Sequence, residues 1–366
     1  MDQYRKLGAP FDASILRKLI DEATFDYDAA NYRAMERTGA FDHFRYLDES
    51  RESLREIAVM KDYLPIDADE DHENPIKSFS FAKMLSTFDQ GLFARQTVNS
   101  SLYGDTIHAL DTAKHSNLRS RSLQYKDYGC FGLTELGHGT GIETRGTMKN
   151  TREFVLNTPS YLGVKWWIEA AGKTANIAAI FAQLYINGVN QGIQVFAVPI
   201  RDYETHQSLP GVTLGDCGPK IGLEGIDNGF IHFTNYRVPY DCLLDRFAQI
   251  DETGKFHSKF KNKAKRFSAM LGGLLRGRTG VLMSSCANLR NALTIAIRCS
   301  AVRRQFGKPG QAERPILDYS LQRYRIMPHL ANVFAVSFAL DEMITNFKST
   351  RTAVHLNPES AESEQC

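Results

Sequence analysis

The sequence has little cysteine, and the cysteines it has are widely spread. Six occur among 366 residues, and no two of them form a C-x-x-C pair. A disulfide framework or a structural zinc site normally needs closer, paired spacing, so neither is expected to organise the fold. We expect small buried thiols in a reducing compartment at all six positions: Cys130, Cys217, Cys242, Cys286, Cys299 and Cys366.

Long apolar runs and a dominant charge are also missing. No hydrophobic stretch approaches the ~20 residues of a membrane-spanning helix, and the polar N-terminus lacks the apolar core of a signal peptide. The formal net charge is +2 at pH 7, whereas nucleic-acid binding usually needs a strong, clustered basic excess. The ten histidines show no H-E-x-x-H spacing. The sequence therefore predicts a soluble intracellular protein with no membrane span, nucleic-acid partner or metal site.

The chain changes character twice along its length. Residues 1–127 show the apolar spacing of helices, whereas residues 128–245 show short β-type runs separated by glycine and proline. Helical spacing returns in residues 260–348, and the polar stretch 349–366 is expected to be a disordered tail. The predicted fold is α+β and multidomain. It has a helical N-terminal domain, a central antiparallel β-barrel or sandwich domain, and the start of a C-terminal helical bundle.

Several single elements are predicted more closely. Asp12 can cap the first helix, and a strand is expected from Ile177 to Ile186, followed by a loop and a second strand from Gly192. Residues 266–298 are expected to form one long helix, and another helix should run from near Pro315 to about residue 347. Apolar side chains on this last helix are expected to lack partners: Leu321, Leu330, Val333, Phe334 and Phe338.

A glycine-rich motif follows the first predicted strand of the central domain. Residues 130–140 read Cys-Phe-Gly-Leu-Thr-Glu-Leu-Gly-His-Gly-Thr. Glycine lets backbone N–H groups approach a ligand closely, and Thr134 and Thr140 add hydroxyl groups that can form hydrogen bonds. A flavin ring, which has apolar faces and a polar edge, needs this combination. A tight turn between two strands explains the same residues equally well.

Two further motifs have a ligand interpretation and a structural one. Residues 165–167 read Lys-Trp-Trp, and strand alternation would allow one tryptophan to pack in the core while the other faces a planar ligand. The alternative is that both tryptophans are buried. Residues 303–307 read Arg-Arg-Gln-Phe-Gly, where a guanidinium group suits a pyrophosphate and the phenylalanine can support an adenine ring. A basic pair at a helix end is the alternative here.

In this order the three motifs resemble the acyl-CoA oxidases, within the wider acyl-CoA dehydrogenase superfamily. The resemblance implies a homodimeric peroxisomal flavoprotein of fatty acid β-oxidation, with FAD between the β domain and the C-terminal helices. It also implies oxidation of a fatty acyl-CoA to trans-2-enoyl-CoA with reduction of molecular oxygen to hydrogen peroxide. Further matching segments lie along the chain: Phe196-Ala-Val-Pro-Ile-Arg, Leu209-Pro-Gly-Val-Thr, Asp227-Asn-Gly, Arg237-Val-Pro and Thr294-Ile-Ala-Ile-Arg.

The resemblance assigns roles to single residues. Thr134 matches the family's flavin-contacting threonine, whereas Arg303, Gln305 and Phe306 match residues that reach the FAD of the other subunit. Glu169 occupies a flavin-contacting position where the family usually has a glycine-containing stretch. Its negative charge would disfavour an anionic reduced flavin if the side chain faced the ring. If the contact is made by the backbone, the side chain can turn to solvent instead.

The family's general base is a glutamate that lies further along than residue 366, so no catalytic residue is assigned. The chain is expected to be truncated before that base and poorly competent alone, and nothing specific supports Glu135 or Glu169 as a substitute. A C-terminal peroxisomal signal of the Ser-Lys-Leu type is also missing. Two alternatives stay open: a non-catalytic protein that binds FAD or acyl-CoA or pairs with a full-length oxidase, and a mitochondrial-type dehydrogenase. The sequences Thr-Glu-Leu-Gly-His-Gly and Val-Lys-Trp-Trp favour an oxidase over a dehydrogenase.

Overall fold

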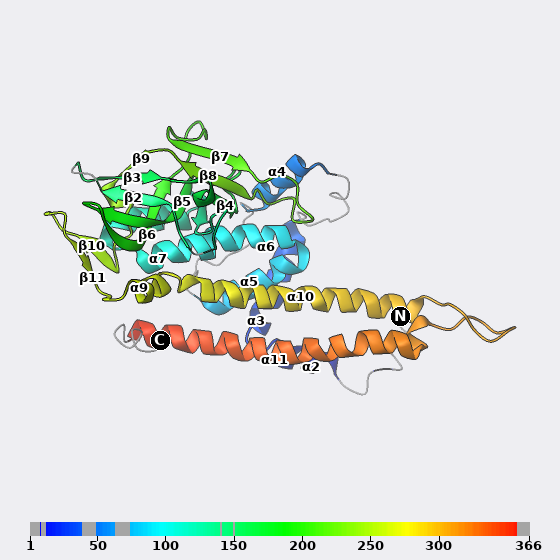
Figure 1. The fold of residues 1–366 in the computed structure, drawn as a ribbon. Coiled ribbons are helices and arrows are strands. Elements are labelled where there is room, and N and C mark those ends of the chain that lie inside the picture. The colour runs from blue at the N-terminus through cyan, green and yellow to red at the C-terminus, as the bar shows by residue number, and fades with distance from the viewer. Residues whose placement is uncertain are drawn as a thin grey trace. The chain divides into compact units, whose positions relative to one another are not determined.

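The computed structural model describes Gly8 and residues 12–38, 49–62, 74–139, 141–148 and 151–356. The chain is a mixed α+β protein, as predicted from the sequence (Figure 1). Its internal contacts divide it into two compact units. The first unit comprises Met1–His43, Leu64–Gln90 and Arg278–Cys366, and the second comprises Phe44–Tyr63 and Gly91–Gly277. The four-part domain division expected from the sequence stays a prediction.

A six-stranded sheet forms the centre of the second unit. Its strands are hydrogen-bonded in the order β1-β5-β2-β3-β9, and β6 also pairs with β5. Because β1 pairs with the first half of β5 and β2 with the second half, these two short strands share one edge of β5. The strands are β1 (Gly129–Gly132), β2 (Arg145–Met148), β3 (Glu153–Asn157), β5 (Ile177–Ile186), β6 (Val189–Pro199) and β9 (Tyr236–Pro239).

The prediction of an antiparallel sheet is wrong for two strand pairs. Both β1 and β2 run parallel to β5, with Gly129 beside Ile177 and Arg145 beside Gln183. The other three pairings in this sheet are of the expected kind, since β2–β3, β3–β9 and β5–β6 are antiparallel. A parallel partner needs a long connection that returns the chain in the same direction. Here the intervening strands supply that length.

The hairpin between β5 and β6 is tighter than the sequence suggested. Strand β5 has the predicted bounds, but β6 begins at Val189 rather than at Gly192. The two residues between the strands, Asn187 and Gly188, have φ angles of 49° and 79°. Asparagine and glycine tolerate this left-handed conformation well, and a two-residue turn of this kind matches the twist of the flanking strands.

The long apolar run of β5 is explained by burial on both faces of the sheet. Ala178, Ile180 and Ala182 belong to one buried cluster, which also includes Phe154. The alternate residues Ile177, Ala179 and Phe181 belong to a second cluster. Since successive side chains of a strand point to opposite faces, a strand that is covered on both sides needs apolar residues at every position. This strand fixes where the neighbouring motif residues lie.

Two smaller sheets and several helices complete the second unit. The sheet β4-β8-β7 is antiparallel, as is β10-β11. The strands are β4 (Lys165–Ile168), β7 (Val212–Asp216), β8 (Gly229–Phe233), β10 (Ala248–Ile250) and β11 (Phe256–Ser258). The helices are α4 (Arg51–Asp62), α6 (Gln90–Gln96), the π-helical η2 (Thr97–Gly104), α7 (Asp105–Leu110), α8 (Ser116–Leu123), α9 (Lys263–Met270) and the 3-10 turns η3 (Ala113–His115), η4 (Tyr161–Gly163) and η5 (Tyr240–Cys242).

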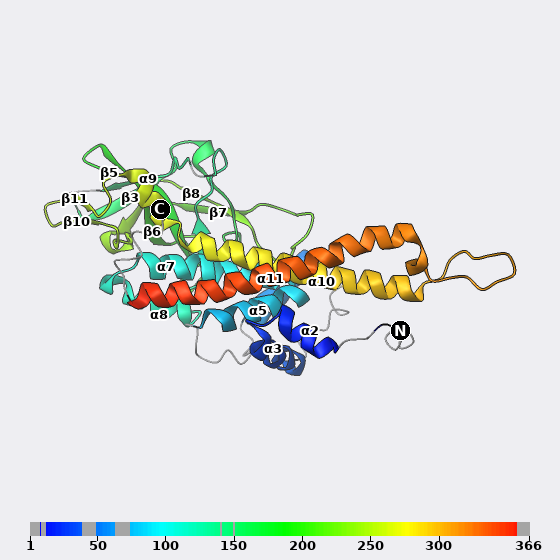
Figure 2. The same cartoon turned by 90° about the horizontal axis from the view of Figure 1, so that it is seen from below.

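The first unit is helical. Helices α10 and α11 lie side by side and run antiparallel (Figure 1 and Figure 2), with Leu293 of α10 packed against Ile326 and Val333 of α11. Helix α2 is capped by Asp12 as predicted, because the Asp12 carboxylate accepts a hydrogen bond of 2.8 Å from the backbone N–H of Ser14. The elements are α2 (Ala13–Ile20), α3 (Phe25–Thr38), α5 (Pro75–Phe88), α10 (Gly273–Val302), the 3-10 turn η6 (Ile316–Asp318) and α11 (Ser320–Leu356). The first turn of α10, residues 273–277, belongs to the second unit.

Three helix predictions need correction. The expected single helix over 266–298 is two helices, because α9 ends at Met270 and α10 begins at Gly273; adjacent glycines at this point lower the helix propensity. Helix α11 continues to Leu356, beyond the expected start of a tail at 349, and residues 357–366 lie outside the described residues. The last helix is also better covered than expected: Val333 is buried, and Leu330 and Phe334 are half-buried, whereas Leu321 and Phe338 are exposed.

Close backbone packing in the second unit makes a first test possible. A Cβ atom added at Gly229 would lie 2.3 Å from the backbone nitrogen of Gly172 and 2.6 Å from the carbonyl oxygen of Gly215. Backbone atoms cannot move aside as a flexible side chain can, so we expect Gly229→Ala to destabilise the protein by about 1–3 kcal/mol. Urea denaturation would measure this. Gly139→Ala is the control, since a Cβ atom there meets nothing within 4 Å; an equal loss in both variants would contradict the packing argument.

Candidate functional site

A large cavity in the second unit brings two of the sequence motifs together. Its volume is about 830 Å³, and most of its wall is apolar. The wall is formed by segments from five parts of the unit, all within residues 94–274. The lining residues are Ala94, Val98, Leu102, Phe131, Leu133, Thr134, Trp167, Ile168, Glu169, Lys220, Ile221, Gly222, Leu223, Ile226, Asn228 and Leu274. The cavity has the size and the mainly apolar lining that are typical of cofactor sites.

Thr134 lies at the edge of this cavity, directly after strand β1. Its side chain is exposed, and its hydroxyl donates a hydrogen bond of 2.8 Å to the carbonyl oxygen of Trp166. The backbone N–H of Trp166 in turn donates to the Thr134 carbonyl at 3.1 Å. The hydroxyl oxygen therefore keeps its lone pairs for a ligand. The second threonine of the motif, Thr140, lies outside the described residues.

The two tryptophans have different surroundings, and a ligand contact of either stays a prediction. Trp166 is half-buried and stacks on Phe230, with ring centroids 6.0 Å apart and an interplanar angle of 11°. Trp167 is 54% exposed and lines the cavity. The alternative in which both are buried is therefore wrong. The backbone causes this difference, because Trp167 has a φ of 63° and the pairing of β4 with β8 is irregular between Trp166 and Ile168.

Glu169 also lines the cavity. It is half-buried rather than exposed, and it follows Ile168, which is buried. The next residue, Ala170, has a φ of 65° and is buried. Non-glycine residues rarely adopt such angles, and they are held there only where the surroundings fix the backbone. The turn from Trp167 to Ala170 is thus a strained segment that forms one wall of the cavity.

A fully buried ion pair lies behind this wall. Lys165 and Glu135 are both completely buried, and their side chains meet at 2.9 Å. The Lys165 amine also donates to the carbonyl oxygen of Phe181 at 2.7 Å, while the Glu135 carboxylate accepts from the backbone N–H groups of Glu143 and Thr144 and from the Thr144 hydroxyl. Burial lowers the pKa of Lys165 to about 8, and the Glu135 carboxylate limits the fall. The pair thus links the segment of Thr134 to strand β4, two segments that form the cavity wall.

This arrangement decides one open question from the sequence. Glu135 had no specific support as a substitute base, and the structure gives it another function. Its carboxylate is buried away from the cavity wall and is saturated with hydrogen bonds from the protein. A general base must instead be within hydrogen-bond reach of a substrate proton. Glu135 is therefore a structural residue in this chain.

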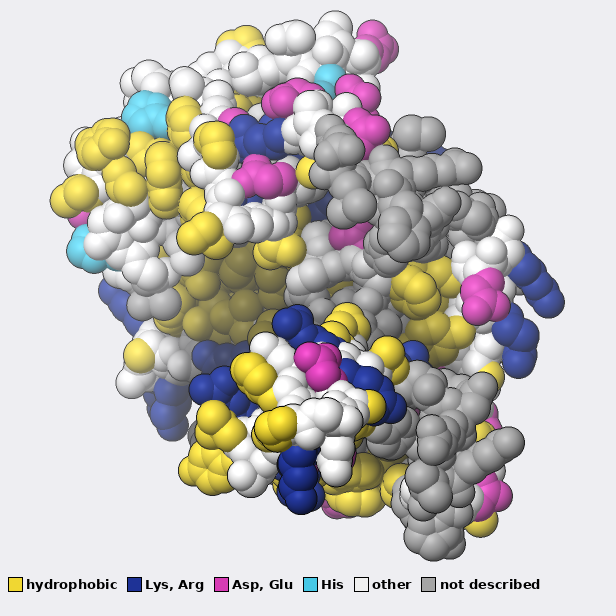
Figure 3. Space-filling view, turned by 90° about the vertical axis from the view of Figure 1, so that its right-hand side faces the viewer, with side chains coloured by type: hydrophobic (Ala, Val, Ile, Leu, Met, Phe, Trp, Pro, Cys, Tyr) yellow, Lys and Arg dark blue, Asp and Glu magenta, His cyan; other side chains and the backbone are white. Residues whose placement is uncertain are grey.

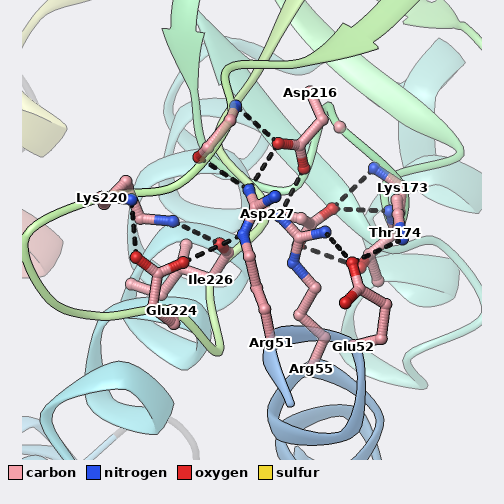
Figure 4. Close-up of polar contacts among 12 residues, drawn as sticks. Arg51, Glu52, Arg55, Lys173, Thr174, Asp216, Lys220, Glu224, Ile226 and Asp227 are labelled. Carbon is pink, nitrogen blue, oxygen red and sulfur yellow. Dashed lines mark hydrogen bonds and ion pairs between the residues drawn. The ribbon is translucent and has the colours of Figure 1, made fainter.

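A second buried ion pair fixes the other end of the strained turn. Arg95 and Asp227 are each 1% exposed and meet at 3.0 Å. Asp227 also accepts hydrogen bonds from the backbone N–H groups of Lys173 and Thr174, at 2.7 and 2.8 Å (Figure 4). The backbone N–H of Gly172 donates to the Asp227 carbonyl oxygen at 3.1 Å. Asp227 thus holds the chain that leads away from the turn. The sequence showed this residue as part of a turn signal, and nothing in the sequence pointed to Arg95 as its partner.

The remaining predicted site residues lie in the first unit. Arg303 and Phe306 are exposed, and Gln305 is half-buried, in the segment between α10 and α11. Phe306 is 69% exposed and has a φ of 57°. The backbone N–H of Gln305 donates to the carbonyl oxygen of Arg314 at 3.1 Å, so the segment is folded back on itself. The structure therefore presents the side chains of Arg303 and Phe306 to solvent.

The described part of the chain has neither a metal cluster nor a membrane-spanning helix. No group of three or more His, Cys, Asp or Glu residues there could hold a metal ion, and none of its helices is long and apolar enough to cross a membrane. The expectation of buried thiols is correct for Cys130 and Cys286, but Cys217 and Cys242 are half-buried and Cys299 is exposed. Exposed hydrophobic side chains gather in several groups on the face shown in Figure 3.

Comparison with known proteins now decides the family. Residues 271–365 match the model for the acyl-CoA oxidase C-alpha1 domain, and residues 130–236 match the model for the acyl-CoA dehydrogenase middle domain. Acyl-coenzyme A oxidase 2 of Arabidopsis thaliana is 39% identical over 290 residues, which cover 76% of this chain and 42% of that protein. The chain belongs to the acyl-CoA oxidase family. Human peroxisomal acyl-coenzyme A oxidase 3 is 34% identical over 83% of this chain and 45% of its own length.

Solved structures of acyl-CoA oxidases agree with this assignment. Acyl-CoA oxidase 1 from Yarrowia lipolytica superposes with a TM-score of 0.84 at 29% identity, over 95% of this chain and 52% of that one. Acyl-CoA oxidase-1 of Caenorhabditis elegans, determined in complex with FAD and ATP, gives a TM-score of 0.80 at 27% identity, over 94% and 52% of the two chains. The chain spans about half the length of the curated relatives it matches.

Proposed function

We propose that this chain forms the flavin- and acyl-CoA-binding part of an acyl-CoA oxidase that acts on fatty acyl-CoA in the peroxisome. The observation that supports it best is the cavity of the second unit, where Thr134, Trp167 and Glu169 share one mainly apolar wall. These are residues of the two motifs from which the sequence predicted a flavin contact. The family supplies the reaction class, and relatives named as peroxisomal supply the proposed location.

The cavity wall fits a flavin ring. Trp167 offers an exposed indole beside the cavity, and Phe131, Leu133 and Ile168 offer apolar surface for the faces of the ring. Thr134 offers hydroxyl lone pairs for its polar edge. Bound FAD would supply the redox chemistry: it would accept a hydride from the β-carbon of the acyl group and return the electrons to oxygen, which gives trans-2-enoyl-CoA and hydrogen peroxide.

The residues of the chain itself would bind the cofactor and orient it. The buried pairs Lys165–Glu135 and Arg95–Asp227 keep Thr134 and the Trp167 turn in place from behind the wall. A preformed wall of this kind lowers the cost of ordering a ligand. Glu169 would add negative charge beside the ring and disfavour an anionic reduced flavin. We assign the removal of the α-proton to no residue of this chain.

Arg303, Gln305 and Phe306 would bind the FAD held by a second copy of the chain, which makes the active form a homodimer. A guanidinium group suits the pyrophosphate that distinguishes FAD from FMN. We expect Arg303→Ala to weaken FAD binding by about 1.5–3 kcal/mol, the scale of a hydrogen bond between charged groups. Titration of the apoprotein with FAD, followed by flavin fluorescence, would measure this.

The control for that prediction is Arg325→Ala, which removes the same charge from an exposed position of α11 in the same unit. It should leave FAD affinity unchanged. Equal FAD affinity in wild type and Arg303→Ala would remove Arg303 from the site and leave the proposed dimer without its main support.

The proposed function has a direct test in the purified 366-residue chain. Flavin absorbance in the visible range would show FAD binding, and a peroxidase-coupled assay with palmitoyl-CoA would show hydrogen peroxide. Binding of both ligands is the expected result. Little or no peroxide is expected alongside binding, because no residue of this chain is assigned the removal of the α-proton. Peroxide release at a rate typical of enzymes, about 1–10³ per second, would mean that this chain holds a base of its own. A chain that binds neither FAD nor palmitoyl-CoA would overturn the proposal.

A further inference from the structure

The loop between β7 and β8, residues 217–228, separates helix α4 from the cavity. On one side, Lys220, Ile221 and Leu223 of this loop form part of the cavity wall. On the other side the loop touches α4 closely: a Cβ atom added at Gly225 would lie 3.4 Å from the carbonyl oxygen of Leu54. The loop is therefore a thin wall between the cavity and α4.

Apolar packing does little to fix the tip of this loop. Ile221 is fully exposed and Leu223 is 45% exposed, although both are large hydrophobic residues. The base is closed by a backbone hydrogen bond of 2.8 Å from Cys217 to Asn228. Between these points the backbone includes two left-handed residues, Gly218 at φ 91° and Leu223 at φ 57°. Something other than core burial must hold the segment against the cavity.

Arg51 of α4 supplies that support. Its guanidinium group contacts three parts of the loop region (Figure 4): the Asp216 carboxylate at 2.5 Å, the Gly218 carbonyl oxygen at 2.7 Å and the Glu224 carboxylate at 2.9 Å. Glu224 also accepts a hydrogen bond of 2.6 Å from the backbone N–H of Lys220. The three side chains are only 20–24% exposed, so water screens their attraction less than it would at an open surface.

A second arginine one turn further along α4 strengthens this network. Arg55 pairs with the other oxygen of the Asp216 carboxylate, and its side chain is 6% exposed. Asp216 also accepts a hydrogen bond of 2.7 Å from the backbone N–H of Gly218. Arg51 differs from Arg55 in one respect that matters here. It alone of the two contacts both ends of the segment, at Gly218 and at Glu224, in the described structure.

We propose that Arg51 is a positioning residue that holds residues 218–224 as a wall of the cavity and so sets how tightly the cavity retains a long acyl chain. The proposal rests on the proposed function, because it takes the acyl chain to lie in the same cavity as the flavin, against the wall formed by residues 218–224. The wall that Arg51 supports is apolar at Ile221 and Leu223, which suits an alkyl chain rather than a charged ligand. Arg51 touches neither ligand itself and acts through Glu224, Asp216 and the loop backbone.

The test compares wild type with Arg51→Gln in the full chain. Hydrogen exchange read by mass spectrometry should be roughly tenfold faster in peptides covering 217–228, which is the effect of losing about one charge-assisted hydrogen bond. Palmitoyl-CoA binding, read from tryptophan fluorescence, should weaken severalfold, and butyryl-CoA binding should change less. FAD binding should be unchanged, because Thr134, Trp167 and Glu169 lie outside residues 217–228. Arg51→Lys should recover part of the loss.

Two further variants keep the test decisive. Glu56→Gln alters the charge of the same helix at an exposed position and should behave as wild type. If Arg51→Gln does not fold, Glu224→Gln removes one of the three contacts alone and should give a smaller change of the same kind. Unchanged loop exchange in both variants would overturn the proposal. Faster exchange with unchanged palmitoyl-CoA affinity would also overturn it. If wild type binds no palmitoyl-CoA, the proposed function fails, and loop exchange alone then decides the role of Arg51.

Discussion

Replacing Lys165 by methionine is expected to destabilise the second unit by about 3–5 kcal/mol, the usual effect of removing one partner from a buried ion pair. Methionine fills much of the lysine volume, so the loss would come from the charge and not from a cavity. Glu135 would remain fully buried beside a neutral side chain, and the carbonyl oxygen of Phe181 would lose its donor. Urea denaturation followed by tryptophan fluorescence measures this, since both tryptophans lie in the same strand, β4.

The matched control for Lys165 is Lys173→Met. The Lys173 side chain is 54% exposed, and its amine pairs with the exposed Glu52 carboxylate at 3.9 Å. An exposed pair at that distance contributes little, so we expect a change below about 1 kcal/mol. FAD retention should fall with Lys165→Met, because the pair joins the Thr134 segment to β4. Equal stability of the two variants would mean that the buried pair does not hold the wall.

The sequence predicted the elements whose signals are local. The apolar run of β5 gave its bounds correctly, since both faces of that strand are buried. Asp12 was recognised as a cap because a carboxylate before an apolar helical pattern acts within a few residues. The contrast between Trp166 and Trp167 was also foreseen as one of two outcomes. In each case the residues that determine the structure are neighbours in the sequence.

What the sequence could not predict depends on contacts between distant residues. Arg51 and Asp216 are 165 positions apart, and Arg95 and Asp227 are 132 positions apart. The sequence marks Asp227 as part of a turn and gives Arg51, Arg95 and Asp216 no special role, because nothing in the local pattern identifies a partner so far along the chain. The parallel pairing of β1 and β2 with β5 was missed for a similar reason. Whether two strands pair in parallel or antiparallel depends on the connection between them. The pattern of apolar residues within a strand carries no information about that connection.

The residues of the candidate site also fall into those that the sequence predicted and those that it did not. Thr134 and Glu169 were assigned from motifs, and the structure places both on one cavity wall. The supporting residues behind that wall, such as Lys165 and Asp227, were read as parts of motifs without a function of their own. Buried ion pairs of this type hold the backbone in unusual conformations, here the left-handed φ of Trp167. Motif matching finds the groups that would touch a ligand, and the structure is needed to find the groups that orient them.

Replacing Asp227 by asparagine should show whether Asp227 only stabilises the fold or also orients the residues of the cavity wall. The change keeps the shape of the side chain but removes the charge opposite Arg95 in a pair whose members are each 1% exposed. We expect a loss of about 3 kcal/mol in the free energy of unfolding, the lower end of the range for a broken buried pair, because the amide oxygen can still accept from Lys173 and Thr174. The turn from Trp167 to Ala170 should then become mobile.

The mobile turn should change two measurable properties of the variant in addition to its stability. Hydrogen exchange should rise at residues 167–174, and FAD should bind more weakly even at temperatures where the variant is fully folded. Asp241→Asn is the matched control, because it makes the same substitution at an exposed position of the same unit and should alter neither property. If Asp227→Asn loses stability while exchange at 167–174 and FAD affinity stay at wild-type values, Asp227 stabilises the fold without orienting the site. The Arg95–Asp227 pair would then have no part in holding the cavity wall.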